Sequence, residues 1–258
     1  MLPVSVDVVR LLGSDSTVLG EVDTAHVGRV GAALSRGRFP KAVSWVDPNE
    51  DAVLAAQRAD RYLLAVADGH HGFDAALAAI QQIESTSAQV LSYDRDGRIV
   101  LSELFARARE QVAQALIPHQ DIRGQSRTAL SVVLVRGREA WGATCGDSSI
   151  FLVRSGKARS LTSSSRFLGP RTPTPSVVRW RLRVGDVLAL VTDGFTDYLS
   201  QPIGTILAEA ARSNDPVQAA QGLVHAAFAG GAGDNVGVAV MLPGERSRHR
   251  QEASPSTR

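Results

Sequence analysis

The order of the apolar segments constrains the fold of this chain more than any other feature. Two helical patterns, at residues 73–91 and 102–117, precede a block of short strand-like segments joined by turns. Two more helical patterns and one last strand follow. Parallel strands need a long crossover, usually a helix, between them, and the middle of the chain offers hairpins instead. The order therefore favours an α+β fold, with helices laid on antiparallel sheets.

The individual segments are bounded by turn residues and by changes of period. Ser102 is the expected N-cap of the second helix, and Ser155-Gly156 predicts a tight hairpin. The apolar run Arg61–Ala67 predicts a buried strand that stops before Asp68. Further strands are expected at 128–135, 139–145, 149–154, 157–161, 177–183, 186–192 and 235–242, and further helices at 202–212 and 216–229.

Cysteine content and charge narrow the class of protein. The chain has 258 residues, of which 44% are hydrophobic, and a single cysteine, Cys145, which excludes an intrachain disulfide and suits a reducing compartment. The first residues lack a basic region, and no apolar run is long enough to span a bilayer. We therefore expect a cytoplasmic protein with no membrane segment.

The net charge of +2 comes from the end of the chain, where four arginines oppose two glutamates after residue 243. The rest is close to neutral, so we expect no nucleic-acid partner. Residues 1–242 are expected to form one domain. The polar segment 243–258 is expected to be a disordered basic tail.

Acidic residues stand beside many of the apolar segments. One aspartate next to a strand is an ordinary turn residue. Several carboxylates at the ends of adjacent strands share one rim, however, where they repel unless a cation neutralises them. A set with only oxygen ligands suits Mg²⁺ or Mn²⁺ rather than zinc. The set is Asp51, Asp68, Asp147, Asp193, Asp197 and Asp234.

Five motifs occur in the order NED, VADGHHG, CGDS, LVTDGFTD and GDN. This order resembles the metal-dependent Ser/Thr protein phosphatases of the PPM family (type 2C), from about Asp47 to Met241. The resemblance implies a four-layer sandwich of two antiparallel β-sheets flanked by helix pairs, with metals at one end.

The resemblance also implies a role for each acidic residue. Asp68 is expected to bridge two metals beside the Gly69 carbonyl, and Asp193 and Asp234 to complete the first site. Glu50 and Asp51 match the acid pair of the second site. Asp147 and Asp197 match positions that hold a weaker third ion together with Asp193. Asp68 and His70 are the expected catalytic residues, with His70 as the general acid.

The chemistry implied is hydrolysis of phosphoserine and phosphothreonine by a water that two Mn²⁺ or Mg²⁺ ions activate. The substrate would be a phosphoprotein, and the enzyme a monomer that opposes a Ser/Thr kinase.

Two departures from the family leave alternatives open. Val46 stands where the family carries an arginine that binds the substrate phosphate, and the helical flap expected after residues 161–162 is missing. One alternative is a catalytically weak or inactive PPM-fold signalling or binding protein. Another is a hydrolase of small phosphoesters, since the site would be open on the flap side.

Overall fold

Two six-stranded antiparallel sheets form the centre of the molecule. The computed structural model describes residues 5–41, 46–163 and 165–242. The first sheet has the order β1 (Asp7–Leu12), β4 (Ala52–Arg58), β5 (Arg61–His70), β6 (Arg127–Arg136), β7 (Glu139–Cys145) and β10 (Val178–Arg181). The second has the order β2 (Asp23–Val27), β3 (Val30–Ser35), β12 (Val236–Met241), β11 (Val187–Val191), β8 (Ser149–Arg154) and β9 (Lys157–Ser160).

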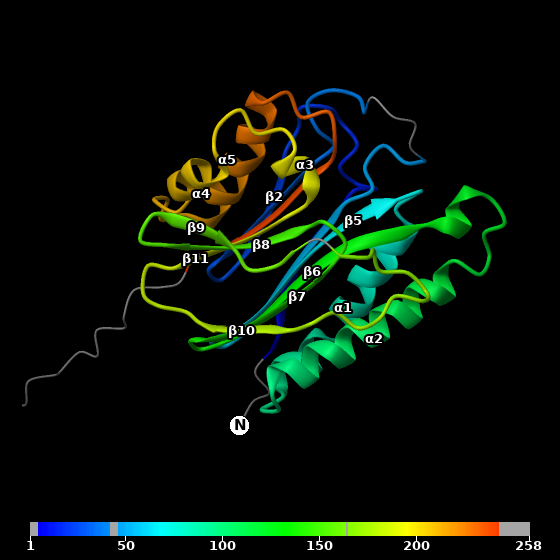
Figure 1. Cartoon of the computed structure of the whole chain (residues 1–258), viewed down its shortest axis with the longest axis horizontal. Helices are drawn as coiled ribbons and strands as arrows, with labels where there is room; N and C mark the ends of the chain where they lie inside the picture. Colours follow the sequence, from blue (N-terminus) through cyan, green and yellow to red (C-terminus); the bar gives the residue numbers. More distant parts are fainter. Residues whose placement is uncertain (1–4, 42–45, 164, 243–258) are drawn as a thin grey trace, which may run out of the picture.

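Helices cover the outer face of each sheet, as Figure 1 shows. The pair α1 (Asp74–Ser92) and α2 (Gly97–Ala115) packs on the first sheet, and α4 (Ile203–Ala210) and α5 (Pro216–Ala229) pack on the second. A short helix α3 (Asp193–Thr196) follows β11, and a 3-10 turn η1 (Ile122–Gln125) precedes β6. The expected four-layer α+β sandwich is confirmed. No helix in the described part of the chain is long and apolar enough to cross a bilayer.

The alternation of side chains along the central strands builds three layers of core. In β5, Leu63 and Ala65 face the α1–α2 pair, whereas Leu64 and Val66 face the second sheet. A third apolar layer lies between the second sheet and α4–α5. Because the central strands are buried on both faces, they form continuous apolar runs in the sequence.

The strand β5 is longer than its apolar run. It continues through Asp68 and Gly69 to His70, which pairs with Arg127 of β6. The expected end before Asp68 is therefore wrong. Backbone pairing with a neighbouring strand does not depend on apolar side chains, so the ladder carries polar residues to the end of the sheet.

The start of α2 also differs from the prediction. The helix begins at Gly97, and the carboxylate of Asp96 accepts a hydrogen bond from the backbone N–H of Arg98. Ser102 lies inside the helix, so its expected role as N-cap is wrong. An aspartate provides the same capping oxygen six residues earlier, and Gly97 allows the helix to start against Trp141.

The strands β1, β2, β3 and β4 are absent from the sequence prediction, whose first strand begins at Arg61. The strand β3 contains Gly31, Ala32 and Ala33, which have little intrinsic preference for strands. A Cβ atom on Gly31 would lie 2.0 Å from the backbone oxygen of Pro216, so a small residue is needed where α5 crosses the sheet. The single-domain expectation for residues 1–242 stays a prediction. The tail at 243–258 lies outside the described residues.

Candidate metal centre

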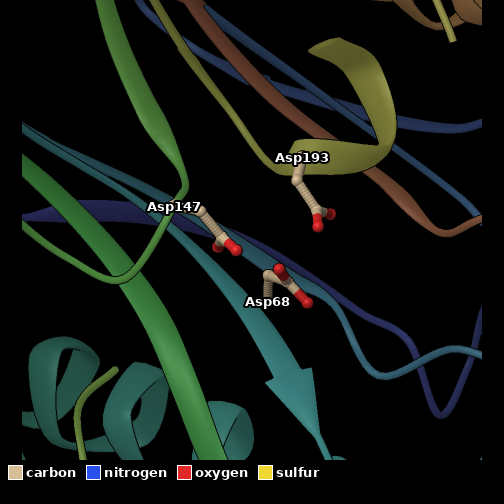
Figure 2. Close-up of side chains that lie close together, drawn as sticks. All are labelled: Asp68, Asp147 and Asp193. Carbon is tan, nitrogen blue, oxygen red and sulfur yellow. The ribbon is translucent and has the colours of Figure 1, made fainter. Parts of the chain in front are cut away.

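Three carboxylates meet at one end of the sandwich. Asp68 comes from β5, Asp147 from the turn between β7 and β8, and Asp193 from the first turn of α3. One carboxylate oxygen from each lies within 4.8 Å of the other two. Figure 2 shows the three side chains pointing toward one another from separate segments. The structure thus brings together three of the predicted ligands.

Asp68 lies within β5, whereas Asp147 and Asp193 lie just beyond the ends of β7 and β11. Asp147 follows Cys145 and Gly146, where the chain passes from the first sheet to the second. Asp193 lies two residues after Val191, the last residue of β11, and follows the N-cap residue Thr192. A Cβ atom on Gly194 would lie 1.9 Å from the backbone oxygen of Asn235, so only glycine lets α3 begin this close to the loop before β12.

Burial and mutual repulsion disfavour the simultaneous ionisation of three or more carboxylates in this cluster. Burial, followed by the neighbouring carboxylates, raises the pKa of Asp68 well above its usual range. Burial likewise raises the pKa of Asp51. The pKa of Asp193 rises to about 7 through burial first and then through the charges of Asp234, Asp147 and Asp197. A cation bound among these groups would stabilise their ionised forms.

Two carboxylate oxygens in the cluster are buried without a partner. Asp68 Oδ2 and Asp147 Oδ1 accept no hydrogen bond from any described residue. A buried polar atom of this kind is costly unless it has a ligand. The donors are all oxygen, which is the set that Mg²⁺ and Mn²⁺ prefer. The residues present therefore fit a hard divalent cation.

The other predicted aspartates lie around this cluster but are not among its three converging carboxylates. Asp51 is buried and accepts a hydrogen bond from the Thr192 hydroxyl at 2.8 Å. Asp234 Oδ1 lies 2.5 Å from Lys41 Nζ. Asp197 ends α3, and its charge acts on Asp193. Asp51 and Asp234 also raise the pKa of a clustered neighbour, so all three lie within electrostatic reach of the centre.

A hydrogen bond between backbone groups joins Glu50 and Gly69. The Gly69 N–H donates to the Glu50 carbonyl at 3.1 Å. The Glu50 carboxylate accepts from the Gly72 N–H at 2.8 Å and from the Val46 and Asp47 N–H groups at 3.3 Å. Both residues line the cavity over the cluster. One oxygen of Glu50 is thus used to hold the turn after β5, a role that the sequence does not reveal.

The two histidines differ in position. The Nδ1 atom of His70 lies 3.6 Å from Asp68 Oδ1, and burial lowers the pKa of its imidazole. The rings of His70 and Phe167 have centroids 4.4 Å apart. His71 has a positive φ of 63° and Gly72 one of 103°, so the chain turns sharply there before α1. Both histidines line the cavity.

The cavity over the cluster has a volume of about 570 Å³ and contains a cation of the protein itself. Lys41 lines it together with Val46, and its positive charge lowers the pKa of Asp51 and Asp68 against the effect of burial. Arg38 instead donates to the Phe228 carbonyl at 3.2 Å. Both cations lie close to Val46 in the sequence, which makes each a candidate for the missing phosphate contact, but only Lys41 lines the cavity.

Two further residues hold the rim of the cavity. The Asn235 side chain accepts from the Glu50 N–H at 2.9 Å and donates to the carbonyls of Arg36 and Pro48, both at 3.1 Å. Arg123 donates to both oxygens of Asp47 at 2.7 Å. These bonds fix the segment that carries Glu50 and Asp51. The GDN motif marked Asn235, but only the structure shows what it binds.

Comparison with known proteins agrees with the resemblance to PPM-family phosphatases. The family model described as stage II sporulation protein E (SpoIIE) matches residues 58–235. The serine/threonine protein phosphatase PstP of Mycobacterium tuberculosis is 30% identical over 222 residues, which cover 74% of this chain and 41% of PstP. The chain thus spans about two fifths of the length of that curated relative.

Solved structures share the fold. The PPM Ser-Thr phosphatase MsPP from Mycobacterium smegmatis, in complex with cacodylate, has a TM-score of 0.67 and 25% identity, over 85% of this chain and 100% of that one. The catalytic domain of PstP in complex with two manganese ions has a TM-score of 0.64 and 25% identity, over 82% and 96%. With the family match over most of its length, this chain belongs to the SpoIIE family of PPM-type phosphatase domains.

Proposed function

We propose that this chain is a metal-dependent phosphoprotein phosphatase that hydrolyses phosphoserine and phosphothreonine. One observation carries the proposal: the carboxylates of Asp68, Asp147 and Asp193 converge within 4.8 Å, and two of their oxygens are buried without a partner. The similarity to PstP, whose catalytic domain is known in complex with two manganese ions, supports it.

The proposed cofactor is a pair of Mn²⁺ or Mg²⁺ ions, with a weaker third site. When bound, such ions would lower the pKa of a water and balance the charge on the phosphoryl oxygens. The chain supplies oxygen ligands, and the segment 46–51 is held in place by Arg123 and Asn235. The proposed ligands are Glu50, Asp51, Asp68, Gly69, Asp147, Asp193, Asp197 and Asp234.

His70 is the proposed proton donor to the leaving serine or threonine oxygen. It lines the same cavity as Asp68, which is the proposed bridging ligand. Burial lowers the pKa of the imidazole, so its protonated form is the minor one at neutral pH. Proton donation by His70 therefore increases as the pH falls toward that pKa.

Lys41 is the proposed contact for the substrate phosphate. It lines the cavity beside Val46. Val46 is the residue that stands where the resemblance leads us to expect an arginine. An ammonium group acts as a point charge and lacks the bidentate geometry of a guanidinium. The substrate phosphate is therefore held weakly, and KM is expected to be high.

The cellular setting is proposed on narrower grounds. The single cysteine, Cys145, is buried, and burial raises the pKa of its thiol to about 12. Such a thiol suits a reducing cytoplasm. We place the enzyme there as a monomer that opposes a Ser/Thr kinase in signalling.

The deciding experiment measures hydrolysis of p-nitrophenyl phosphate and of a phosphothreonine peptide with Mn²⁺. We expect both to be hydrolysed, EDTA to abolish the reaction, and Asp193→Asn to reduce it by at least two orders of magnitude. Asp94→Asn, at an exposed carboxylate paired with Arg61, is the matched control.

Two other outcomes would favour the alternatives. Bound metal without any hydrolysis would support a weak or inactive signalling protein. Hydrolysis of the small ester alone would support a small-phosphoester hydrolase.

A further inference from the structure

A second cavity, of about 610 Å³, lies beside the acidic one. Arg127, Arg166 and Arg171 line it, together with apolar groups of Leu116, Phe167 and Pro170. None of these residues belongs to the predicted metal site. We call this space the basic cavity.

The basic cavity and the acidic cavity share a wall. Phe167 lines the basic cavity, and its ring packs against His70, which lines the acidic one. The guanidinium of Arg127 lies 5.0 Å from the centroid of the same Phe167 ring. In η1, Ile122 lines the acidic cavity and Gly124 lines the basic one. A peptide whose phosphate lies over the metal site would therefore have its neighbouring residues at the basic cavity.

The charge of the basic cavity is not balanced from within the described part of the chain. All three arginines are exposed, and no described carboxylate lies within ion-pair distance of Arg127, Arg166 or Arg171. Arg123, close by in the chain, is by contrast bound by Asp47 and Asp74. Guanidinium groups over an apolar floor are well suited to bind a carboxylate or phosphate group.

The wall of the basic cavity is held by backbone hydrogen bonds. Thr128 and Leu168 exchange two of these, at 3.1 and 2.7 Å. The Gly146 N–H donates to the Arg166 carbonyl at 3.0 Å, and Arg109 of α2 donates to the Thr172 carbonyl at 3.2 Å. A wall fixed before binding lowers the entropy lost when a ligand binds.

We propose that the basic cavity binds an anionic side chain of the substrate, a carboxylate or a second phosphate, within a few residues of the phosphoserine or phosphothreonine. The assignment rests on the proposed phosphatase function. It makes Arg127, Arg166 and Arg171 specificity residues that select substrates with acidic or multiply phosphorylated segments.

The test compares kcat/KM for phosphothreonine peptides of one length. Their flanking residues are neutral, contain glutamates before or after the phosphothreonine, or contain a second phosphothreonine. We expect the anionic peptides to be preferred over the neutral one by about tenfold, the size of one charge-assisted contact. Preference for the glutamate peptide identifies a carboxylate ligand, and preference for the doubly phosphorylated peptide identifies a phosphate.

The matched variants are Arg166→Gln with Arg171→Gln, and Arg212→Gln as the control at an exposed arginine after α4. The double variant should bring the preference ratio close to one, whereas the control should keep it. Equal kcat/KM for neutral and anionic peptides in the unmodified protein would overturn the proposal. So would a ratio that survives in the double variant.

A binding measurement separates this inference from the proposed function. The probe is a fluorescein-labelled, unphosphorylated peptide rich in glutamate, titrated in EDTA and followed by fluorescence anisotropy. If no peptide is hydrolysed, the phosphatase proposal fails, yet the anisotropy still reports on the basic cavity. Binding that weakens about tenfold in the double variant supports the cavity, and unchanged or absent binding contradicts it.

Discussion

Val46 lies in the wall of the acidic cavity, half-buried and without charge. Among the described residues, Lys41 is the only lysine or arginine that lines this cavity, and its ammonium group already contacts Asp234. A lysine engaged with a carboxylate is a weaker phosphate ligand than a guanidinium that is free to bind two oxygens. At the scale of single residues, the site has its acids but lacks a strong phosphate contact.

Val46→Arg is therefore expected to lower KM for a phosphothreonine peptide by about tenfold, because it adds charge-assisted hydrogen bonds to the phosphate. Steady-state kinetics with Mn²⁺ measure this change. Val46→Met, which is long but uncharged, is the control and should leave KM close to its original value. An unchanged KM in the arginine variant, or an equal gain with methionine, would argue against the missing contact.

At the scale of elements, the points where helices and strands end determine where the candidate functional side chains lie. The strand β5 runs past its apolar segment and carries Asp68 and His70 to the end of the sheet. The N-cap of the helix α2 is Asp96, six residues before the expected Ser102. Helix α2 in turn anchors the wall of the basic cavity through Arg109.

Asp96→Ala is expected to lower the free energy of unfolding by about 1 kcal/mol, since the Arg98 N–H loses its capping acceptor. Ser102→Ala, inside the same helix, is the matched control and should change it by less than about 0.5 kcal/mol. Urea denaturation of both variants measures the difference. A larger loss for Ser102→Ala would contradict the observed start of α2.

At the scale of the whole molecule, the sandwich holds several carboxylates together at one end. Burial and mutual repulsion raise the pKa values of Asp51, Asp68 and Asp193, so ionising these groups costs folding free energy. The apolar layers on both sides of each sheet offset this cost. A bound divalent cation would reduce it.

Mn²⁺ at about 100 times its Kd is therefore expected to stabilise the metal-free protein by about 2.7 kcal/mol. For a chain of this size, that corresponds to a rise in Tm of roughly 5–10 °C. Differential scanning fluorimetry with and without EDTA measures it. The rise should be much smaller in Asp193→Asn and preserved in Asp94→Asn. A full rise in Asp193→Asn would mean that the ion binds elsewhere.

The sequence by itself determined the α+β class, most of the strands and helices, and the set of acidic residues. These features depend on local information: the period of the apolar residues, the turn residues and the order of motifs such as VADGHHG and LVTDGFTD. It did not reveal β3, because glycine and alanine show little strand preference until α5 packs on them.

Only the tertiary structure decided which of these residues meet and what else lies between them. It brought Asp68, Asp147 and Asp193 together, engaged one oxygen of Glu50 with backbone N–H groups, and placed Lys41 among the acids. It also gathered three arginines around the basic cavity, from segments that share no motif. The physical reason is that contacts between residues far apart in the chain depend on strand register and on the packing of layers, which no local pattern specifies.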